Sequence, residues 1–529
     1  MIEIEGDTIH VNFSEWTPEA YEVFLQSKRL PEYNLDYEWE TDTYHLRCPA
    51  RFAHIFGVDA AAADMGWDSI SGHLFDYQKW ISETALKAKR YAVWADTGLG
   101  KTHIQWEFAR QVVHRTRRKV LFIVPLNILR QTVEIGRDHF ALPEVSILDG
   151  RERMRAWCKS PGPGIGMVNP EKFIPRNGEP EIVSECQYLA GVVLDESSLL
   201  KSGGGKIKWS LIKSCKGIEY KLSCTATPAP NDTMEYASQG SFLEKLRNEG
   251  DILWTYFTRN KEGEWKVKEH AREAFYRFMS GWSVYLRSPA MYGFEDNLKD
   301  LPPPSVTEYR IEPTRSQMDM IHAVPDNEGQ LSAFSNRHKL QMTHRIGYSQ
   351  IAKGFRYAED GIAVRVESRK PAFVADLIRS DLREGRQVLV WTVFDEEARI
   401  IEELLAGEGG VEALHGKIPK ARRGEIVERF RTGKSRVLIT KASLLGFGLN
   451  FQMCSSMVFS GLDDSYERMY QAIRRAYRYG QTKTVRVHIP YIPELEGTVW
   501  ANVREKQAKF DRDATLQERY YLEAIRRKA

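Results

Sequence analysis

The stretch YAVWADTGLGKTHIQWEFARQ, which runs from Tyr91 to Gln111, joins an apolar run to a helix-like pattern through a tight glycine-rich turn. Its centre, ADTGLGKT, fits the phosphate-binding loop from Gly100 onward, with Ala95 where the simplest form of the motif has glycine. Gly98 and Gly100 let backbone N–H groups turn inward around an anion, and the helix that follows offers its partly positive N-terminus to phosphate. Because a strand pattern precedes the turn and a helix pattern follows it, nucleotide binding is favoured over a glycine turn with a surface lysine.

Side chains in and near this turn have the chemistry of a site for ATP with Mg²⁺. Lys101 would neutralise the β- and γ-phosphate oxygens, and Thr102 would ligate Mg²⁺. Thr97 lies in the same turn, directly before Gly98. Upstream, Gln78 in the sequence DYQ presents a donor and acceptors that suit the edge of adenine.

Composition and length limit the class of protein. The chain has 529 residues, enough for several domains, and its 42% hydrophobic and 28% charged content is that of a soluble globular protein. It has no run of about 18 apolar residues and no basic-then-apolar start, so we expect an intracellular, cytoplasmic protein without a membrane segment. The six cysteines form no C-x-x-C pair, which argues against a zinc site and suits a reducing compartment.

Charge is distributed unevenly along the chain. Residues 1–70 hold fourteen Asp and Glu against four Lys and Arg, a net charge of −10, and subtraction from the total of +3 leaves about +13 for the remainder. The basic remainder of the chain is suited to binding a polyanion, whereas the acidic residues 1–70 are not. We expect residues 1–70 either to cover a basic DNA-binding surface and inhibit the protein, or to be a solvated domain that docks a protein partner.

The order of apolar patterns indicates an α/β fold in several parts. The first 50 residues have the strand and helix patterns of a small α+β unit. Two later regions alternate buried-strand runs with helix patterns, and the stiff sequence LPPPSV (301–306) separates them. Two α/β lobes, of which only one has a phosphate-binding loop, suggest a nucleotide held between lobes. The expected parts are an acidic N-terminal accessory domain (1–70), a first ATP-binding lobe (71–240), a helical insertion (241–300), a second lobe (301–495) and a helical tail (496–529).

The sequence VVLDESSLLK places Asp195 and Glu196 at the end of an apolar strand. In a protein with a phosphate-binding loop, the first acid there holds Mg²⁺ through water, and its neighbour polarises the attacking water. The alternative is a pair of acids that cap a helix. The preceding strand and the upstream loop favour the catalytic role. LSCTATPAPN (222–231) then supplies hydroxyl groups that could sense the γ-phosphate and link the lobes.

Two C-terminal stretches complete the expected site. In QAIRRAYRYGQ (471–481), Arg475 and Arg478 are three residues apart, so a helix would project both from one face to neutralise the transferring phosphoryl group. The alternative is a basic face that contacts nucleic acid. In LLGFGLNFQ, Gly446 and Gly448 expose backbone that could touch both nucleotide and a phosphodiester chain, and the alternative there is an ordinary strand–helix turn.

In this order, these segments resemble the superfamily 2 helicases, and within them the Swi/Snf-type translocases, from residue 74 to about 510. DYQ is similar to the Q motif, ADTGLGKT to motif I, LDESS to motif II, TATPAPN to motif III, GFGLNF to motif V and QAIRRAYRYGQ to motif VI. The size is similar to that of compact bacterial and phage members, which implies the cytoplasm of a bacterial cell or of a phage-infected host. The resemblance implies two RecA-like lobes with parallel sheets, and an ATPase, stimulated by DNA, that moves along duplex DNA.

The resemblance also implies roles for single residues. Motif II ends in Ser197 and Ser198 where many members have a histidine, so the histidine-mediated link to motif III is absent here. Carried over by position, the phosphate and Mg²⁺ ligands are Lys101, Thr102 and Asp195; Glu196 activates water; Arg475 and Arg478 are arginine fingers; Gln78 reads adenine; Thr97, Gly98, Gly100, Gly446 and Gly448 complete the nucleotide site; and Asn127, Lys417, Thr440 and Lys441 contact the DNA backbone.

Three functions are compatible with these residues. The leading one is a monomeric, ATP-driven translocase on double-stranded DNA that remodels DNA or displaces bound protein. A second is strand separation or branch migration at forked DNA, which needs a wedge or pin that the sequence does not identify. A third is an ATP-gated DNA-binding subunit of a restriction or defence complex, which the presence of Glu196, Arg475 and Arg478 disfavours.

Overall fold

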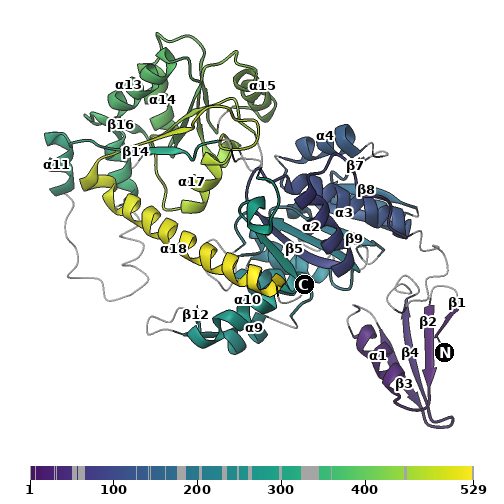
Figure 1. Ribbon diagram of the computed structural model, residues 1–529. Helices are drawn as coiled ribbons and strands as arrows, with labels where there is room; N and C mark the ends of the chain where they lie inside the picture. Colours follow the sequence, from purple (N-terminus) through teal and green to yellow (C-terminus); the bar gives the residue numbers. More distant parts are fainter. Residues whose placement is uncertain are drawn as a thin grey trace. The chain divides into compact units, whose positions relative to one another are not determined.

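The structure, a computed structural model, divides into two units (Figure 1). The first unit is formed by Met1–Asp296 and Thr515–Ala529, and the second by Asn297–Ala514. The described residues are 2–526 except 6–7, 29, 31–32, 50–55, 57–65, 127, 141, 143–144, 161, 175–185, 187, 202–204, 229–234, 247–248, 260–264, 297–298, 300, 323–344, 359, 417 and 446–449.

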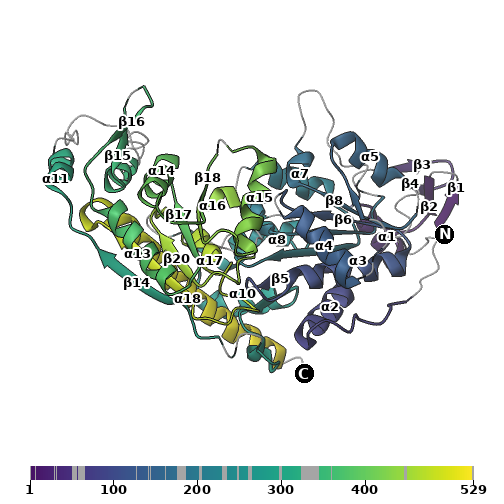
Figure 2. The ribbon, with the colours of Figure 1, turned by 90° about the horizontal axis from the view of Figure 1, so that it is seen from above.

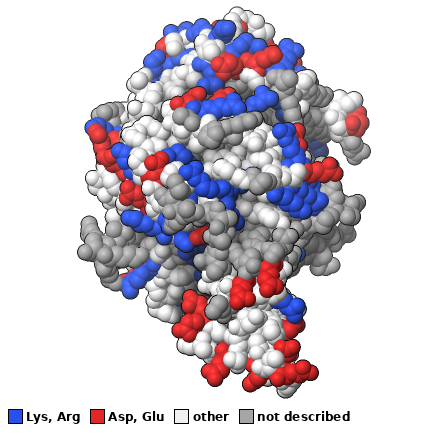
Figure 3. All heavy atoms as spheres, turned by 90° about the vertical axis from the view of Figure 1, so that its right-hand side faces the viewer, with Lys and Arg blue, Asp and Glu red and all other residues white. Residues whose placement is uncertain are grey.

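The chain starts with a small antiparallel sheet and one helix, as the sequence predicts. Helix α1 (Pro18–Ser27) begins where expected, because the Thr17 hydroxyl accepts a hydrogen bond from the backbone N–H of Ala20 at 3.2 Å and proline occupies the first turn. Asp and Glu (red) gather on this part, which lies at the bottom of Figure 3, while Lys and Arg (blue) are prominent on the rest of that face. The strand order is β1 (Ile2–Glu5), β2 (Thr8–Phe13), β4 (Thr43–Pro49) and β3 (Asn34–Glu38).

The main sheet of the first unit has seven strands, and all its neighbouring strands are parallel. Its strands are short apolar runs with almost every residue buried, the pattern of a sheet covered on both faces. Helices flank the sheet in two views (Figures 1 and 2). The strand order is β13 (Ser283–Leu286), β5 (Arg90–Ala95), β10 (Tyr220–Thr225), β9 (Gly191–Leu194), β6 (Lys119–Ile123), β8 (Gly164–Val168) and β7 (Val145–Ile147).

Residues 241–300 are not only helical, which corrects the sequence-based expectation. They contain α9 (Glu249–Tyr256) and α10 (Arg272–Ser280), but also an antiparallel ribbon of β11 (Phe257–Arg259) and β12 (Trp265–Val267). Strand β13 then joins the main sheet beside β5. Strands of three or four residues are too short for a period-of-two pattern to identify them, so periodicity alone did not reveal them.

A buried ion cluster joins two strands of this sheet. Glu244 accepts hydrogen bonds from Arg90 Nη1 of β5 at 2.6 Å, Lys221 Nζ of β10 at 2.7 Å and the backbone N–H of Gly217 at 2.7 Å. Burial by itself raises the pKa of Glu244, but the charges of Lys221 and Arg90 outweigh burial and lower the pKa to about 2. The carboxylate is therefore held ionised inside the fold.

The second unit contains a six-stranded sheet in which all neighbouring strands are also parallel. Apolar side chains of α13 (Lys370–Arg383) and α14 (Asp395–Leu404) pack on one face, and those of α15 (Lys420–Arg431) and α17 (Tyr466–Ile473) on the other. Two parallel sheets of this kind, each flanked by helices, confirm the expected pair of RecA-like lobes. The strand order is β14 (Ser305–Arg310), β21 (Arg486–Tyr491), β20 (Ser456–Phe459), β17 (Val388–Thr392), β19 (Val437–Lys441) and β18 (Val411–Leu414).

One long helix, α18 (Pro493–Arg526, yellow in Figure 1), supplies residues to both units. Near its start, Glu496 accepts hydrogen bonds from Lys353 Nζ at 2.7 Å and Lys370 Nζ at 2.6 Å inside the second unit. Near its end, Gln517 accepts a hydrogen bond from the hydroxyl of Tyr236 at 3.0 Å inside the first unit. Across the described residues, no helix combines the length and the apolar character needed to cross a bilayer.

Candidate nucleotide site

The turn between β5 and α3 (Lys101–Thr116) has the backbone of a phosphate-binding loop. Gly98 has φ of +92° and Gly100 has φ of +70°, in the left-handed region where an L side chain is strained. A Cβ atom at Gly100 would also stand 2.2 Å from the Nε2 atom of Gln78. The positive φ therefore favours glycine at position 100, and a larger residue would also have to displace the Gln78 amide.

Gln78, which lies on α2 (Asp76–Ala88), supports this loop directly. Its side chain is 3% exposed, and its Nε2 donates to the carbonyl of Leu99 at 3.2 Å. The hydroxyl of Tyr77 donates to the same carbonyl at 3.0 Å, and Gln78 Oε1 accepts from the backbone N–H of Phe75 at 3.1 Å. The side chain expected to read adenine thus also fixes the phosphate-binding loop, and its role toward adenine stays a prediction.

The lysine of the loop points back into the curve that the loop forms. Lys101 Nζ donates to the carbonyl of Ala95 at 2.8 Å and lies 3.3 Å from the carbonyl of Asp96. The Asp96 carboxylate in turn accepts from the backbone N–H of Thr97 at 2.7 Å. Thr102 follows Lys101 in the first turn of α3, where the helix N-terminus favours negative charge.

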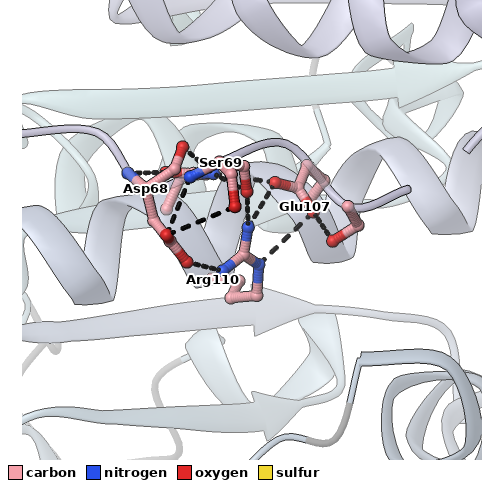
Figure 4. A network of polar contacts seen from close by, with 6 residues as sticks. Asp68, Ser69, Glu107 and Arg110 are labelled. Atoms are coloured by element: carbon pink, nitrogen blue, oxygen red, sulfur yellow. Dashed lines mark hydrogen bonds and ion pairs between the residues drawn. The ribbon is translucent and has the colours of Figure 1, made fainter. Parts of the chain in front are cut away.

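Helix α3 is held in place by a polar network with the segment that enters the lobe (Figure 4). Arg110 donates to the Asp68 carboxylate at 2.5 Å, to the carbonyl of Ser69 at 2.7 Å and to Glu107 at 2.7 Å. Gln111 adds a bond to the carbonyl of Asp68 at 2.9 Å. These bonds fix the helix whose first turn carries Lys101 and Thr102.

Asp195 lies directly after β9 and is 6% exposed. Its carboxylate accepts from Gln105 Nε2 at 2.7 Å and from the backbone N–H of Glu196 at 3.0 Å. Burial raises the pKa of Asp195, although the Gln105 bond and the charge of Lys101 oppose the rise. Gln105 Oε1 is buried without a hydrogen-bond partner. The Asp195 carboxylate, the unpaired Gln105 amide oxygen and the hydroxyl of Thr102, which lies on the same helix as Gln105, are hard oxygen donors. These residues therefore fit ATP bound with Mg²⁺.

Glu196 has a backbone conformation that is rare for a residue with a side chain. Its φ is +52°, a left-handed value that costs about 1 kcal/mol or more outside glycine. The Glu196 carboxylate accepts from the Ser198 hydroxyl at 3.2 Å and lies 3.4 Å from the hydroxyl of Thr225, at the end of β10. Lys89 and Arg117, at the ends of α2 and α3, also have positive φ, so the backbone alone assigns no task, and the role of Glu196 in activating water stays a prediction.

A fully buried glutamine, which sequence reasoning missed, connects three motifs of the first lobe. Gln239 lies on α8 (Glu235–Phe242), and its Oε1 accepts from Trp94 Nε1 at 2.9 Å and from the Ser197 hydroxyl at 3.0 Å. The Ser223 hydroxyl lies 3.4 Å from the same oxygen, and Gln239 Nε2 donates to the carbonyl of Pro228 at 3.0 Å. Motif II and motif III are thus joined by a glutamine and two serines in place of the absent histidine.

The arginines of QAIRRAYRYGQ do not share a helical face, which corrects the sequence-based expectation. Helix α17 ends at Ile473, and both Arg475 and Arg478 lie in the turns that follow. The carbonyl of Arg475 accepts a bond from the backbone N–H of Phe451 at 2.9 Å, a contact with a distant segment that competes with the helix. Arg478 donates to the side chain of Asn450, and burial lowers the pKa of Arg478 to about 10.

The expected DNA contacts are only partly described. Thr440, on β19, is fully buried, so its side chain does not reach the surface of the second unit. Lys441 Nζ pairs with the Asp395 carboxylate at 2.9 Å and stays partly exposed. Four other predicted residues lie outside the described residues: Asn127, Lys417, Gly446 and Gly448.

Comparison with known protein families finds two matching models, one on each lobe. Residues 71–155, which include the phosphate-binding loop, match the model described as type III restriction enzyme, res subunit. Residues 369–480, which include both arginines, match the helicase conserved C-terminal domain.

Curated relatives are similar over part of the chain. "TATA-binding protein-associated factor mot1" of Aspergillus fumigatus is 23% identical over 352 residues, 56% of this chain and 18% of the relative. "Protein CHROMATIN REMODELING 4" of Arabidopsis thaliana is 21% identical, over 58% of this chain and 14% of the relative. "ATP-dependent RNA helicase eIF4A" of Eremothecium gossypii is 33% identical over 106 residues, 19% of this chain and 26% of the relative. The chain thus spans about a quarter or less of the length of these relatives.

Among solved structures, the chain is similar to the "Sulfolobus solfataricus SWI2/SNF2 ATPase core in complex with dsDNA". That structure is 19% identical with a TM-score of 0.39, and the match covers 81% of this chain and 90% of the other. A second structure, "Sulfolobus solfataricus SWI2/SNF2 ATPase core domain", is 18% identical with a TM-score of 0.38, and the match covers 82% of this chain and 88% of the other.

Proposed function

For this chain, a superfamily 2 helicase of the Swi/Snf type with an ATP-binding, hydrolytic core, we propose the function of a motor that hydrolyses ATP to move along double-stranded DNA. The observation that carries the proposal is the assembly of Lys101, Asp195 and Glu196 around one phosphate-binding loop in the first lobe. These residue types are the ones that bind a nucleoside triphosphate and activate water.

Each side chain has a proposed task in hydrolysis. Lys101 binds the β- and γ-phosphates, and Thr102 and Asp195 hold Mg²⁺, which when bound supplies positive charge to the phosphate oxygens. Glu196 orients the attacking water and accepts its proton, so that the products are ADP and phosphate. The Thr225 hydroxyl near Glu196 supports this task, because it restricts where the carboxylate lies.

The arginines of the second lobe are proposed to stabilise the transition state. Arg475 is 7% exposed, and Arg478 is held by Asn450, so their guanidinium groups have defined positions rather than those of solvated surface arginines. Charge on the transferring phosphoryl group is what such arginines neutralise in related reactions. Gln78 is proposed to read adenine, and Gly446 and Gly448 to complete the nucleotide site.

Duplex DNA is the proposed track. The residues after position 70 carry about +13, which favours a polyanion, and two relatives are by name a TATA-binding protein-associated factor and a chromatin remodelling protein. Lys441, Lys417, Asn127 and Thr440 are the proposed backbone contacts, with Thr440 dependent on a change that exposes it. Residues 1–70, at −10, are proposed to dock a protein partner, because their charge repels DNA.

Steady-state ATP hydrolysis tests the proposal. Hydrolysis is measured with no nucleic acid, blunt duplex DNA, single-stranded DNA and RNA, and Lys101→Ala serves as the blank. We expect strong stimulation by duplex DNA that the blank lacks. Stimulation mainly by single strands would favour strand separation instead, and turnover at the level of the blank with every polymer would favour an ATP-gated subunit of a larger complex.

A further inference from the structure

Beside the antiparallel ribbon of the first unit lies a cluster of an exposed tryptophan, a half-buried tryptophan and an exposed arginine. Trp254, on α9, is 77% exposed, and its ring lies 6.0 Å from that of Trp265 in an edge-to-face arrangement. Arg259 is directly opposite Trp265 in the β11–β12 pairing, and its guanidinium lies 4.9 Å from the centre of that ring. Neither the nucleotide site nor the expected DNA contacts use these residues.

Packing below the ribbon and one hydrogen bond hold the cluster in place. Phe257 begins β11, is 2% exposed and packs on Phe275 of α10 at a ring distance of 5.5 Å. Lys268 Nζ donates to the carbonyl of Trp254 at 3.0 Å, which ties the end of α9 to the residue that follows β12. This packing restricts where the two rings can lie, so binding a ligand there costs less ordering than binding to a loose segment.

The chemistry of the cluster matches an unpaired nucleobase. Aromatic faces stack on bases of any sequence, and a guanidinium adds attraction to both base and phosphate. Arg259 and Lys266 are exposed on the ribbon and Lys268 follows it, while Glu249 and Asp251 on α9 and Glu269 after Lys268 balance these charges. The cations therefore act by direct contact and not through a net positive charge. Paired bases in a duplex hide their faces inside the stack, so a Trp ring can reach only bases that are unpaired.

Another exposed tryptophan, Trp39, provides a comparison with Trp254. Trp39 is 85% exposed, but it lies in the acidic N-terminal part between Glu38 and Glu40. There the residues on both sides are acidic, whereas Arg259 lies over the ring of Trp265, which contacts Trp254. Exposure alone therefore does not distinguish the two sites, and the cation in contact with the aromatic pair does.

We propose that Trp254, Trp265 and Arg259 form a binding site for unpaired bases of a DNA strand. This inference rests on the proposed function, since it assumes that the motor acts on DNA. It adds a second contact on the substrate, at branches, gaps or ends where bases are unpaired. The cluster is also an element of the kind needed at forked DNA, a wedge or pin, which the sequence alone did not identify.

The test compares single-stranded and duplex DNA with one pair of matched variants. Affinity is measured by fluorescence anisotropy with fluorescein-labelled oligothymidylate and with a labelled blunt duplex of equal length, at one fixed salt concentration. Trp254→Ala removes an exposed ring from α9 beside the ribbon, and Trp39→Ala removes a ring of similar exposure from the acidic part. Thermal melting checks that each variant is folded.

We expect Trp254→Ala to bind oligothymidylate about tenfold more weakly, the loss of roughly one stacked base, and to change duplex affinity less than about twofold. Trp254→Phe, which keeps an aromatic face, restores most of the loss. Trp39→Ala changes neither affinity. Arg259→Ala weakens oligothymidylate binding in the same direction and is the second test if Trp254→Ala does not fold.

Several results would overturn the inference. Unchanged oligothymidylate affinity in Trp254→Ala would mean that the cluster serves a protein partner or none. An equal loss on both DNAs would make it a duplex contact. If the parent protein itself bound neither DNA and showed no stimulation of ATP hydrolysis, the proposed function would fail first, and the inference with it.

Discussion

Replacing Gln239 with methionine tests whether the buried amide couples the motifs of the ATP site. Methionine keeps the length and approximate volume of glutamine, so packing changes little. It removes the acceptor shared by Trp94, Ser197 and Ser223 and the donor that binds the carbonyl of Pro228. Three of these bonds are 3.0 Å or shorter, and all lie in a region with almost no solvent exposure.

The expected magnitude follows from those bonds. At about 1 kcal/mol each, loss of the three short bonds lowers the free energy of unfolding of the first lobe by about 3 kcal/mol. The bond from Ser197 alone, at about 1 kcal/mol, raises the ratio of the observed position of the motif II segment to its alternatives roughly fivefold. We therefore expect kcat for ATP hydrolysis to fall by up to about fivefold. KM for ATP should change less than about twofold, because Gln239 bonds to strands and to Ser197 rather than to the phosphate-binding loop.

The assay is steady-state ATP hydrolysis in saturating duplex DNA, with thermal melting in parallel. Gln317→Met is the matched control, since Gln317 is also fully buried and its Nε2 donates to the carbonyl of Ile351 at 2.9 Å in the second unit. The control should lose stability and keep its kcat. If Gln239→Met melted earlier but kept the parental kcat, Gln239 would be a packing residue and the coupling argument would be refuted. If it did not fold, Ser197→Ala removes one arm alone and should lower kcat to a similar extent.

Three further changes have definite expected outcomes. Gly100→Ala should weaken binding of a fluorescent ATP analogue about tenfold by strain and by displacing Gln78, whereas Gly293→Ala, with φ of +79° and open space around it, should not. Glu244→Gln should lower the melting temperature at pH 7; because the folded-state pKa of Glu244 is held below its usual value, at about 2, the difference of about 3 kcal/mol should disappear as the pH falls from about 4.5 toward 2. Arg478→Lys should lower kcat about a hundredfold or more with little change in KM for ATP, and an unchanged kcat would remove Arg478 from the transition state.

The parts of the site that the sequence predicted are those fixed by local rules. The phosphate-binding loop needs two glycines at positive φ and a lysine at the start of a helix, and Gly98, Gly100 and Lys101 have that geometry. The run before Asp195, GVVL, is a buried strand because it is a continuous hydrophobic segment in a sheet covered on both faces. In such places, neighbouring residues alone decide the conformation.

The parts that the sequence did not predict depend on distant contacts. Spacing alone put Arg475 and Arg478 on one helix, but the helix ends first, and the Arg475 carbonyl bonds to Phe451, 24 positions earlier. Gln239 joins Trp94 and Ser197, which are 145 and 42 positions away, and no local pattern marks it. The sequence did not predict the β11–β12 ribbon, because each strand has three residues, too few to show a period of two.

The long helix α18 sets an order on how the chain can mature during synthesis. The first unit includes residues from Thr515 onward, and 297–514, a stretch of 218 positions, is translated between its two parts. Tyr236 and Ser283 of the first unit bond to Gln517 and Tyr521, so these buried groups lack those partners until α18 has left the ribosome. Until α18 is synthesised, the first unit of a nascent chain therefore lacks the contacts that Gln517 and Tyr521 make. A protein truncated before residue 515 would lack these contacts permanently.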